Sequence, residues 1–165
     1  DGLFEGKADR TLAGKIVNLI RFHSLDSLKL ARRLERFAGE QGRIFPVLLE
    51  CNVSGEESKH GWSACDEARW ETLLPELADI STLAHLQVRG LMTMAPYSEE
   101  AEHSRLYFQR LQRLSVFLAE SLPAANWTEL SMGMSGDYQV AIQEGATILR
   151  IGTAIMGLRP CAVNL

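Results

Sequence analysis

The sequence predicts an α/β fold in which parallel strands and helices alternate, as in part of a (β/α) TIM-type barrel. Strand-like and helix-like apolar patterns follow one another along the 165 residues, with no hairpin signal between them. Residues 44–53 are almost continuously apolar, which is typical of a strand buried on both faces of a parallel sheet. Two glycine-and-hydroxyl turns follow the last two predicted strands, which favours a barrel over an open doubly wound sheet.

The first half of the chain contains two strand-and-helix units. A strand is predicted over residues 19–24, and the apolar spacing of residues 26–37 predicts the helix that follows it. After the strand at 44–53, the pattern of residues 64–74 predicts a second helix. Pro75 is expected to open another, shorter helix, because proline is favoured in a first helical turn.

The second half contains three strands, each followed by a helical pattern. The strongest of these patterns places apolar residues along one side of a long amphipathic helix. The strands are predicted at 86–93, 128–131 and 147–151, and the helical segments at 99–122, 137–144 and 153–158. Because a complete barrel has eight strands, five predicted strands indicate an incomplete one, in which the first two to three βα units are missing.

Composition and charge limit the classes of partner that the chain is expected to bind. Apolar residues make up 46% and charged residues 23% of the chain, as in ordinary globular proteins. The net charge is −4 without a basic run, so nucleic acid is not expected. No apolar stretch approaches the roughly 20 residues of a membrane span. The histidines lack metal-ligand spacing, so no metal site is predicted. Three cysteines without zinc-ligand spacing indicate reduced thiols in a cytoplasmic protein: Cys51, Cys65 and Cys161.

The two turns near the end of the chain carry the donors for an anion. They lie in the segments 131–137 (SMGMSGD) and 150–157 (RIGTAIMG). Glycine lets the backbone approach a phosphate, free N–H groups point toward it, and a hydroxyl adds a donor. We predict that Ser135 and Gly136 form one wall of a phosphate cup, and that Gly152 and Thr153 form the other. Ordinary loop turns are the alternative interpretation.

Five short motifs together resemble the YggS/PROSC family of pyridoxal-phosphate-binding homeostasis proteins. They occur in the order seen in that family, and the resemblance covers residues 13 to 158. The motifs are 23–27 (HSLDS), 48–61 (LLECNVSGEESKHG), 89–96 (RGLMTMAP), 130–137 (LSMGMSGD) and 149–157 (LRIGTAIMG).

The resemblance implies a single (β/α) barrel like the N-terminal domain of alanine racemase. It also implies a monomer that binds pyridoxal 5′-phosphate, has no established turnover, and influences the supply of the cofactor and of some amino acids. In this family-like interpretation Arg150 donates to the pyridine nitrogen of the cofactor. A structural ion pair with Glu50 or Glu129 is the alternative. Met92 and Met134 complete the candidate cofactor-binding set, with packing in the core as the alternative for a methionine.

The front of the chain departs from the family pattern. We treat residues 1–165 as one partial barrel domain with a diverged segment at 1–12, where only Phe4 and Gly6 fit the family's third strand. None of the four lysines follows an apolar strand as the family's Schiff-base lysine does: Lys7, Lys15, Lys29 and Lys59. We therefore expect noncovalent cofactor binding and no enzyme activity.

Two other functions stay open at this point. The chain can be a truncated scaffold or gene remnant that binds nothing, and its unpaired strand edges then predict self-association. A racemase or decarboxylase of the same barrel superfamily needs a second β domain and a catalytic lysine, which the sequence does not contain.

Overall fold

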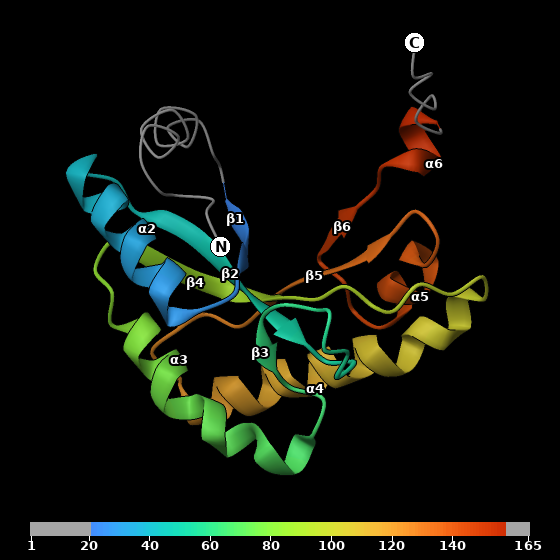
Figure 1. Cartoon of the computed structure of the whole chain (residues 1–165), viewed down its shortest axis with the longest axis horizontal. Helices are drawn as coiled ribbons and strands as arrows, with labels where there is room; N and C mark the ends of the chain where they lie inside the picture. Colours follow the sequence, from blue (N-terminus) through green and yellow to red (C-terminus); the bar gives the residue numbers. More distant parts are fainter. Residues whose placement is uncertain (1–20, 158–165) are drawn as a thin grey trace.

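A curved sheet of parallel strands forms the centre of the computed structural model, which describes residues 21–157 (Figure 1). Every strand pair is parallel, as predicted. The sheet order is β1 (Phe22–Leu25), β2 (Phe45–Asn52), β4 (Leu86–Met92), β5 (Glu129–Met134) and β6 (Ile148–Arg150), and β3 (Trp62–Ser63) pairs with β2 outside this path. The sheet curls like half of a barrel, so the predicted incomplete (β/α) barrel is confirmed. The diverged segment at 1–12 lies outside the described residues.

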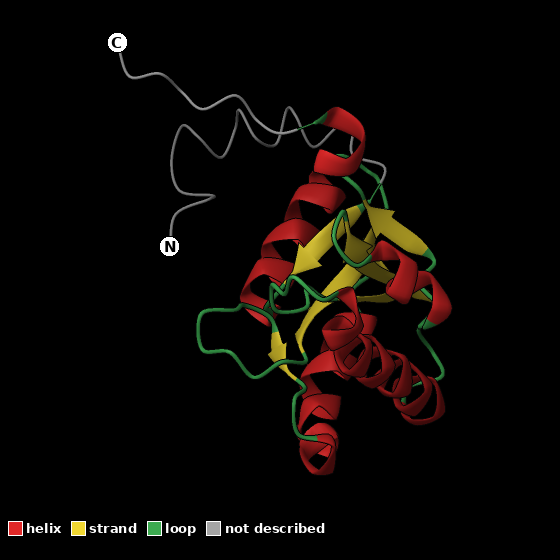
Figure 2. Ribbon diagram, turned by 90° about the vertical axis from the view of Figure 1, so that its right-hand side faces the viewer, coloured by secondary structure: helices red, strands yellow, loops and turns green. Residues whose placement is uncertain are grey.

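The helices lie around the strands, which group in the centre of the molecule (Figure 2). Figure 1 shows the larger helices on the convex side of the curved sheet. The helical elements are α2 (Leu28–Glu40), η1 (Glu67–Leu73), α3 (Leu74–Ser81), η2 (Ala101–Ser104), α4 (Arg105–Ser121), α5 (Tyr138–Gln143) and α6 (Thr153–Met156).

The segment predicted to be helical at 64–74 is helical over Glu67–Leu73, as the 3₁₀ helix η1. It follows the two-residue strand β3, and its start is capped by Asp66 accepting from the amide of Ala68. The indole of Trp70 donates to the carbonyl of Ala64 at 3.1 Å, which holds this turn against the sheet. Pro75 lies in the first turn of α3, as predicted.

The core lies between the convex face of the sheet and the helices. Helix α4 contributes four side chains at helical spacing, all fully buried: Phe108, Leu111, Leu114 and Leu118. Burying each stabilises the fold by about 1.5–3 kcal/mol relative to exposure. The strands contribute Leu49, Leu91 and Leu130, which are register partners across β2, β4 and β5.

The concave face of the sheet carries a second row of side chains, which differs from the leucine row of the convex face. Side chains alternate along a strand, so the residues after those three leucines point to the opposite face. They are Glu50, Met92 and Ser131, which are also register partners across the three strands. The alternation therefore separates an apolar convex face from a concave face with polar groups, and the candidate site lies on the latter.

Candidate functional site

The two glycine-and-hydroxyl turns meet at the carboxyl ends of β5 and β6. Met134 and Arg150 are register partners in these neighbouring strands, so the turns that follow begin side by side. Ser135 then joins them, because its Oγ accepts from the amide of Gly152 at 3.2 Å and from that of Ala154 at 3.1 Å. The structure thus brings together the two walls that the sequence predicted for a phosphate cup.

Space and donors are both present at this junction. A Cβ built on Gly136 or Gly152 meets nothing within 4 Å, so the backbone is open on both turns. The amides of Gly136 and Thr153 donate to no other residue within the described range. Both lone pairs of Ser135 Oγ are engaged by amides, which leaves its O–H as a donor. Two amides and one hydroxyl are a donor set suited to an anion.

The nearby carboxylate of Asp137 is tied to other groups. Its Oδ1 accepts from the amide of Met134 at 2.7 Å, and its Oδ2 accepts from the hydroxyl of Ser104 at 2.9 Å. Although Asp137 occupies the position before α5, its side chain makes no capping bond to that helix. These bonds fix the turn that presents Ser135.

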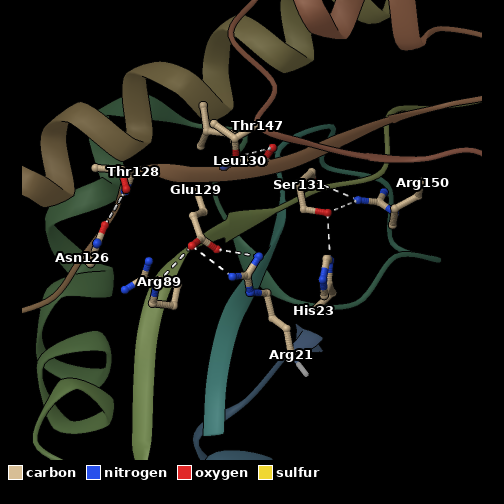
Figure 3. Close-up of polar contacts among 10 residues, drawn as sticks. All are labelled: Arg21, His23, Arg89, Asn126, Thr128, Glu129, Leu130, Ser131, Thr147 and Arg150. Carbon is tan, nitrogen blue, oxygen red and sulfur yellow. Dashed lines mark hydrogen bonds and ion pairs between the residues drawn. The ribbon is translucent and has the colours of Figure 1, made fainter. Parts of the chain in front are cut away.

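Arg150 lies on the concave face and forms no ion pair with another residue between 21 and 157 (Figure 3). Its Nη1 donates to the carbonyl of Ser131 at 2.9 Å and to Ser131 Oγ at 2.7 Å. Its Nη2 donates to the carbonyl of Thr93 at 2.8 Å. A guanidinium has five N–H donors, so two of them have no partner among the described residues.

The alternative ion pair with Glu129 is not formed. Glu129 is instead paired with Arg21, with Nη1 to Oε2 at 3.0 Å, and with Arg89, with Nε to Oε1 at 3.0 Å (Figure 3). Glu50 acts on Arg150 only through its charge; its carboxyl is buried, and burial together with the charge of Asp26 raises its pKa. Burial lowers the pKa of Arg150, yet arginine stays charged in proteins.

His23 on β1 extends this polar cluster. Its Nδ1 lies 3.0 Å from Ser131 Oγ, so one hydroxyl contacts both the imidazole and Arg150. Burial, and then the positive charges of Arg150 and Arg21, lower the pKa of His23 below its usual 6.5. The concave face therefore combines a permanently charged arginine with an imidazole that is mostly neutral at pH 7.

The two methionines of the predicted set lie in different surroundings. Met92 is 3% exposed and sits next to Ser131 in the register of the concave face. Met134 is 40% exposed, at the start of the turn that contains Ser135. The sequence did not identify Ser131, Thr93 or His23 as parts of the site. Strand alternation on β5 was the signal for Ser131, but its partners depend on registers that the sequence does not display.

The described part of the chain has neither a metal-binding cluster nor a membrane-spanning helix. Between residues 21 and 157 no group of three or more His, Cys, Asp or Glu side chains is arranged to hold a metal ion. Over the same range, none of the helices combines the length and apolar character needed to traverse a lipid bilayer.

Comparison with known proteins adds a family relationship. The family model of the alanine racemase N-terminal domain matches residues 3–160. A pyridoxal phosphate homeostasis protein of Aquifex aeolicus is 42% identical over 149 residues, which cover 90% of this chain and 60% of that protein. A protein of the same name from Synechocystis is 36% identical over 157 residues, covering 94% of this chain and 69% of the relative.

A solved structure shows the same relationship in three dimensions. PipY of Synechococcus elongatus with pyridoxal phosphate (PLP) bound matches with a TM-score of 0.75 at 37% identity, covering 93% of this chain and 68% of that one. The chain is shorter than these relatives, because it spans only 60% of the length of the Aquifex protein and 69% of that of the Synechocystis protein.

Proposed function

The chain belongs to the pyridoxal phosphate homeostasis protein family, and we propose that it binds PLP noncovalently and serves cofactor and amino-acid homeostasis without turnover. The observation that carries this proposal is the junction of the two turns through Ser135. It supplies convergent donors at the carboxyl edge of a parallel sheet, where barrels bind phosphate. The PLP-bound relative supports the assignment of the ligand.

The phosphate is the part of the cofactor that this junction suits. The amides of Gly136 and Thr153 and the hydroxyl of Ser135 would hold it, in the open space beside Gly136 and Gly152. Each charge-assisted hydrogen bond contributes about 1.5–3 kcal/mol, so three such bonds contribute about 4.5–9 kcal/mol, which corresponds to a dissociation constant between roughly 0.5 mM and 0.3 μM. The two methionines, Met92 and Met134, would supply apolar contacts for the ring.

Arg150 is the residue that we assign to the pyridine nitrogen. It lies on the same strand end as the second turn, and two of its N–H groups lack described partners. Bound PLP supplies an electron-withdrawing ring, and that ring is weaker as an electron sink when its nitrogen is unprotonated. A permanently charged arginine donates to that nitrogen without protonating it, which supports binding without strong catalysis.

The lysines in the described range support noncovalent binding. Lys29 is exposed on α2. Lys59 forms an ion pair with Glu56 and donates to Ser54 Oγ at 3.3 Å and to the carbonyl of Met94 at 3.1 Å. We place this function in the cytoplasm, where free thiols such as Cys51 and Cys65 are the rule.

Titration with PLP and with pyridoxal, which lacks the phosphate, tests the proposal. We expect PLP to bind at least roughly 100-fold more tightly, because the phosphate contributes two or more charge-assisted bonds. Absorbance at the cofactor band gives both dissociation constants. Borohydride treatment of the complex is expected to leave the mass of the chain unchanged, because no Schiff base is present to be reduced.

Equal affinity for PLP and pyridoxal would show that the turns do not hold the phosphate. A mass increase equal to that of the reduced cofactor would show a covalent link. Absence of binding by either compound would favour the scaffold that binds nothing. That scaffold also predicts self-association through β1 and β6, the end strands of the described sheet, which sedimentation of the same sample would detect.

A further inference from the structure

Three hydrogen-bonding groups form a chain across the concave face, from β1 through β5 to β6. His23 Nδ1 lies 3.0 Å from Ser131 Oγ, and Ser131 Oγ accepts from Arg150 Nη1 at 2.7 Å (Figure 3). Ser131 has no exposed surface, so water does not complete its hydrogen bonds. This cluster is separate from the two turns assigned to the phosphate.

Resting on the proposed function, we propose that Ser131 and His23 are positioning residues that hold Arg150 toward the cofactor ring, and that this requires His23 Nδ1 to accept a hydrogen bond. In this arrangement Ser131 Oγ accepts from Arg150, and its hydroxyl donates a hydrogen bond to His23 Nδ1. Neither Ser131 nor His23 needs to touch the cofactor. They act by fixing one orientation of a long side chain that otherwise has several.

The direction of the bonds follows from satisfying every buried group. A hydroxyl has one proton to donate. The carbonyl oxygen of Ser131 already accepts from Arg150 Nη1 and from the amide of Thr93, so both of its lone pairs are used and it offers no place for that proton. The Nδ1 of His23 is the nearby acceptor, provided that its proton is on Nε2. A protonated Nδ1 would leave the Ser131 hydroxyl buried without an acceptor, which is costly.

The charges around His23 make this bond sensitive to acid. Arg150 on β6 and Arg21 beside β1 both oppose a second positive charge, and Glu129 on β5 favours it. Glu129 is already paired with Arg21 and with Arg89 of β4. The remaining strand, β2, brings the buried Glu50 to this face. The balance keeps His23 neutral at pH 7, with a pKa below 6.5.

Acid is expected to weaken the binding of PLP that depends on this network. His23 is mostly neutral at pH 7 and above because its pKa is lowered, so the affinity for PLP through this network changes little there. As the pH falls through the lowered pKa of His23, its Nδ1 becomes a donor, and the anchor of Arg150 is lost. The phosphate of PLP also titrates near pH 6, so the effect is measured as a difference between the wild type and a variant that cannot titrate.

The test compares four variants of the full chain by PLP titration between pH 5 and 8. Ser131→Ala and His23→Leu remove the hydroxyl and the acceptor, and each is expected to weaken binding roughly tenfold at pH 7.5. His23→Asn keeps an acceptor near the Nδ1 position, so it is expected to retain affinity and lose the extra acid dependence. Ser98→Ala is the matched control, because it removes an exposed Ser–His bond, from Ser98 to His103 Nδ1 at 2.9 Å.

A second measurement does not require any variant to fold. Ring ¹⁵N NMR of the wild-type chain without cofactor is expected to show His23 with an unprotonated Nδ1 at pH 7.5 and a pKa below the usual 6.5 of histidine. A protonated Nδ1 at that pH would overturn the inference. So would wild-type affinity and pH profile in both Ser131→Ala and His23→Leu. Failure of the wild type itself to bind PLP would instead overturn the proposed function.

Discussion

A Gly133→Ala variant is expected to lose about 2–5 kcal/mol of folding free energy, because the new methyl group meets both backbone strain and a collision. Gly133 has φ +90°, in the left-handed region that side chains disfavour. A Cβ there lies 2.5 Å from the Cβ of Ala141 on α5, which is itself fully buried. Thermal unfolding should therefore shift down by roughly 5–20 °C.

Gly145→Ala is the matched control for this prediction. Gly145 has a nearly identical φ of +87°, but a Cβ there meets nothing within 4 Å. The Gly145→Ala variant is therefore expected to lose only about 1–2 kcal/mol of folding free energy, the cost of a side chain in the left-handed region. Equal destabilisation of the two variants would contradict the close packing of β5 against α5. Since β5 leads directly into Ser135, that packing also fixes the position of the phosphate turns.

Replacing Ser135 with aspartate is expected to abolish most PLP binding while leaving the fold intact. A carboxylate can accept from the amides of Gly152 and Ala154, as the hydroxyl does now, so the two turns stay joined. Its negative charge then faces the phosphate, and charges about 4 Å apart near a protein surface repel by about 4 kcal/mol. Affinity should fall by on the order of 100-fold or more.

Two comparisons make this result specific. Ser135→Ala removes a donor and the junction between the turns without adding charge, so its loss should be smaller, roughly tenfold. Pyridoxal, which has no phosphate, should bind Ser135→Asp and the wild type alike. If Ser135→Asp binds PLP as tightly as the wild type, the phosphate is held elsewhere.

Much of the fold could be predicted from the sequence because its longer strands are apolar and alternate regularly with helical patterns. The parallel sheet, the amphipathic helix α4 and the position of Pro75 all followed from local patterns. The short elements did not. Two residues at Trp62–Ser63 carry no periodic signal, and the apolar spacing of residues 64–74 did not show that η1 is a 3₁₀ helix.

The site was predictable to a smaller extent. The turns around Ser135 and Gly152 are visible as glycine-and-hydroxyl clusters, because their chemistry is local. The bonds that hold Arg150 are not, since they join residues 19 and 57 positions apart in the sequence. They depend on the registers of β4, β5 and β6. From the sequence, Glu129 was one alternative ion-pair partner for Arg150, whereas in the folded chain Glu129 pairs with Arg21 and Arg89.

The most direct test of the central claim is amide NMR of the ¹⁵N-labelled chain during addition of PLP. The claim is that two turns form one anion site. We therefore expect the amide signals of Gly136 and Thr153 to move together, with the same dissociation constant, and inorganic phosphate to move the same two signals. Shifts confined to one turn, or to lysine-bearing segments away from both, would contradict the account.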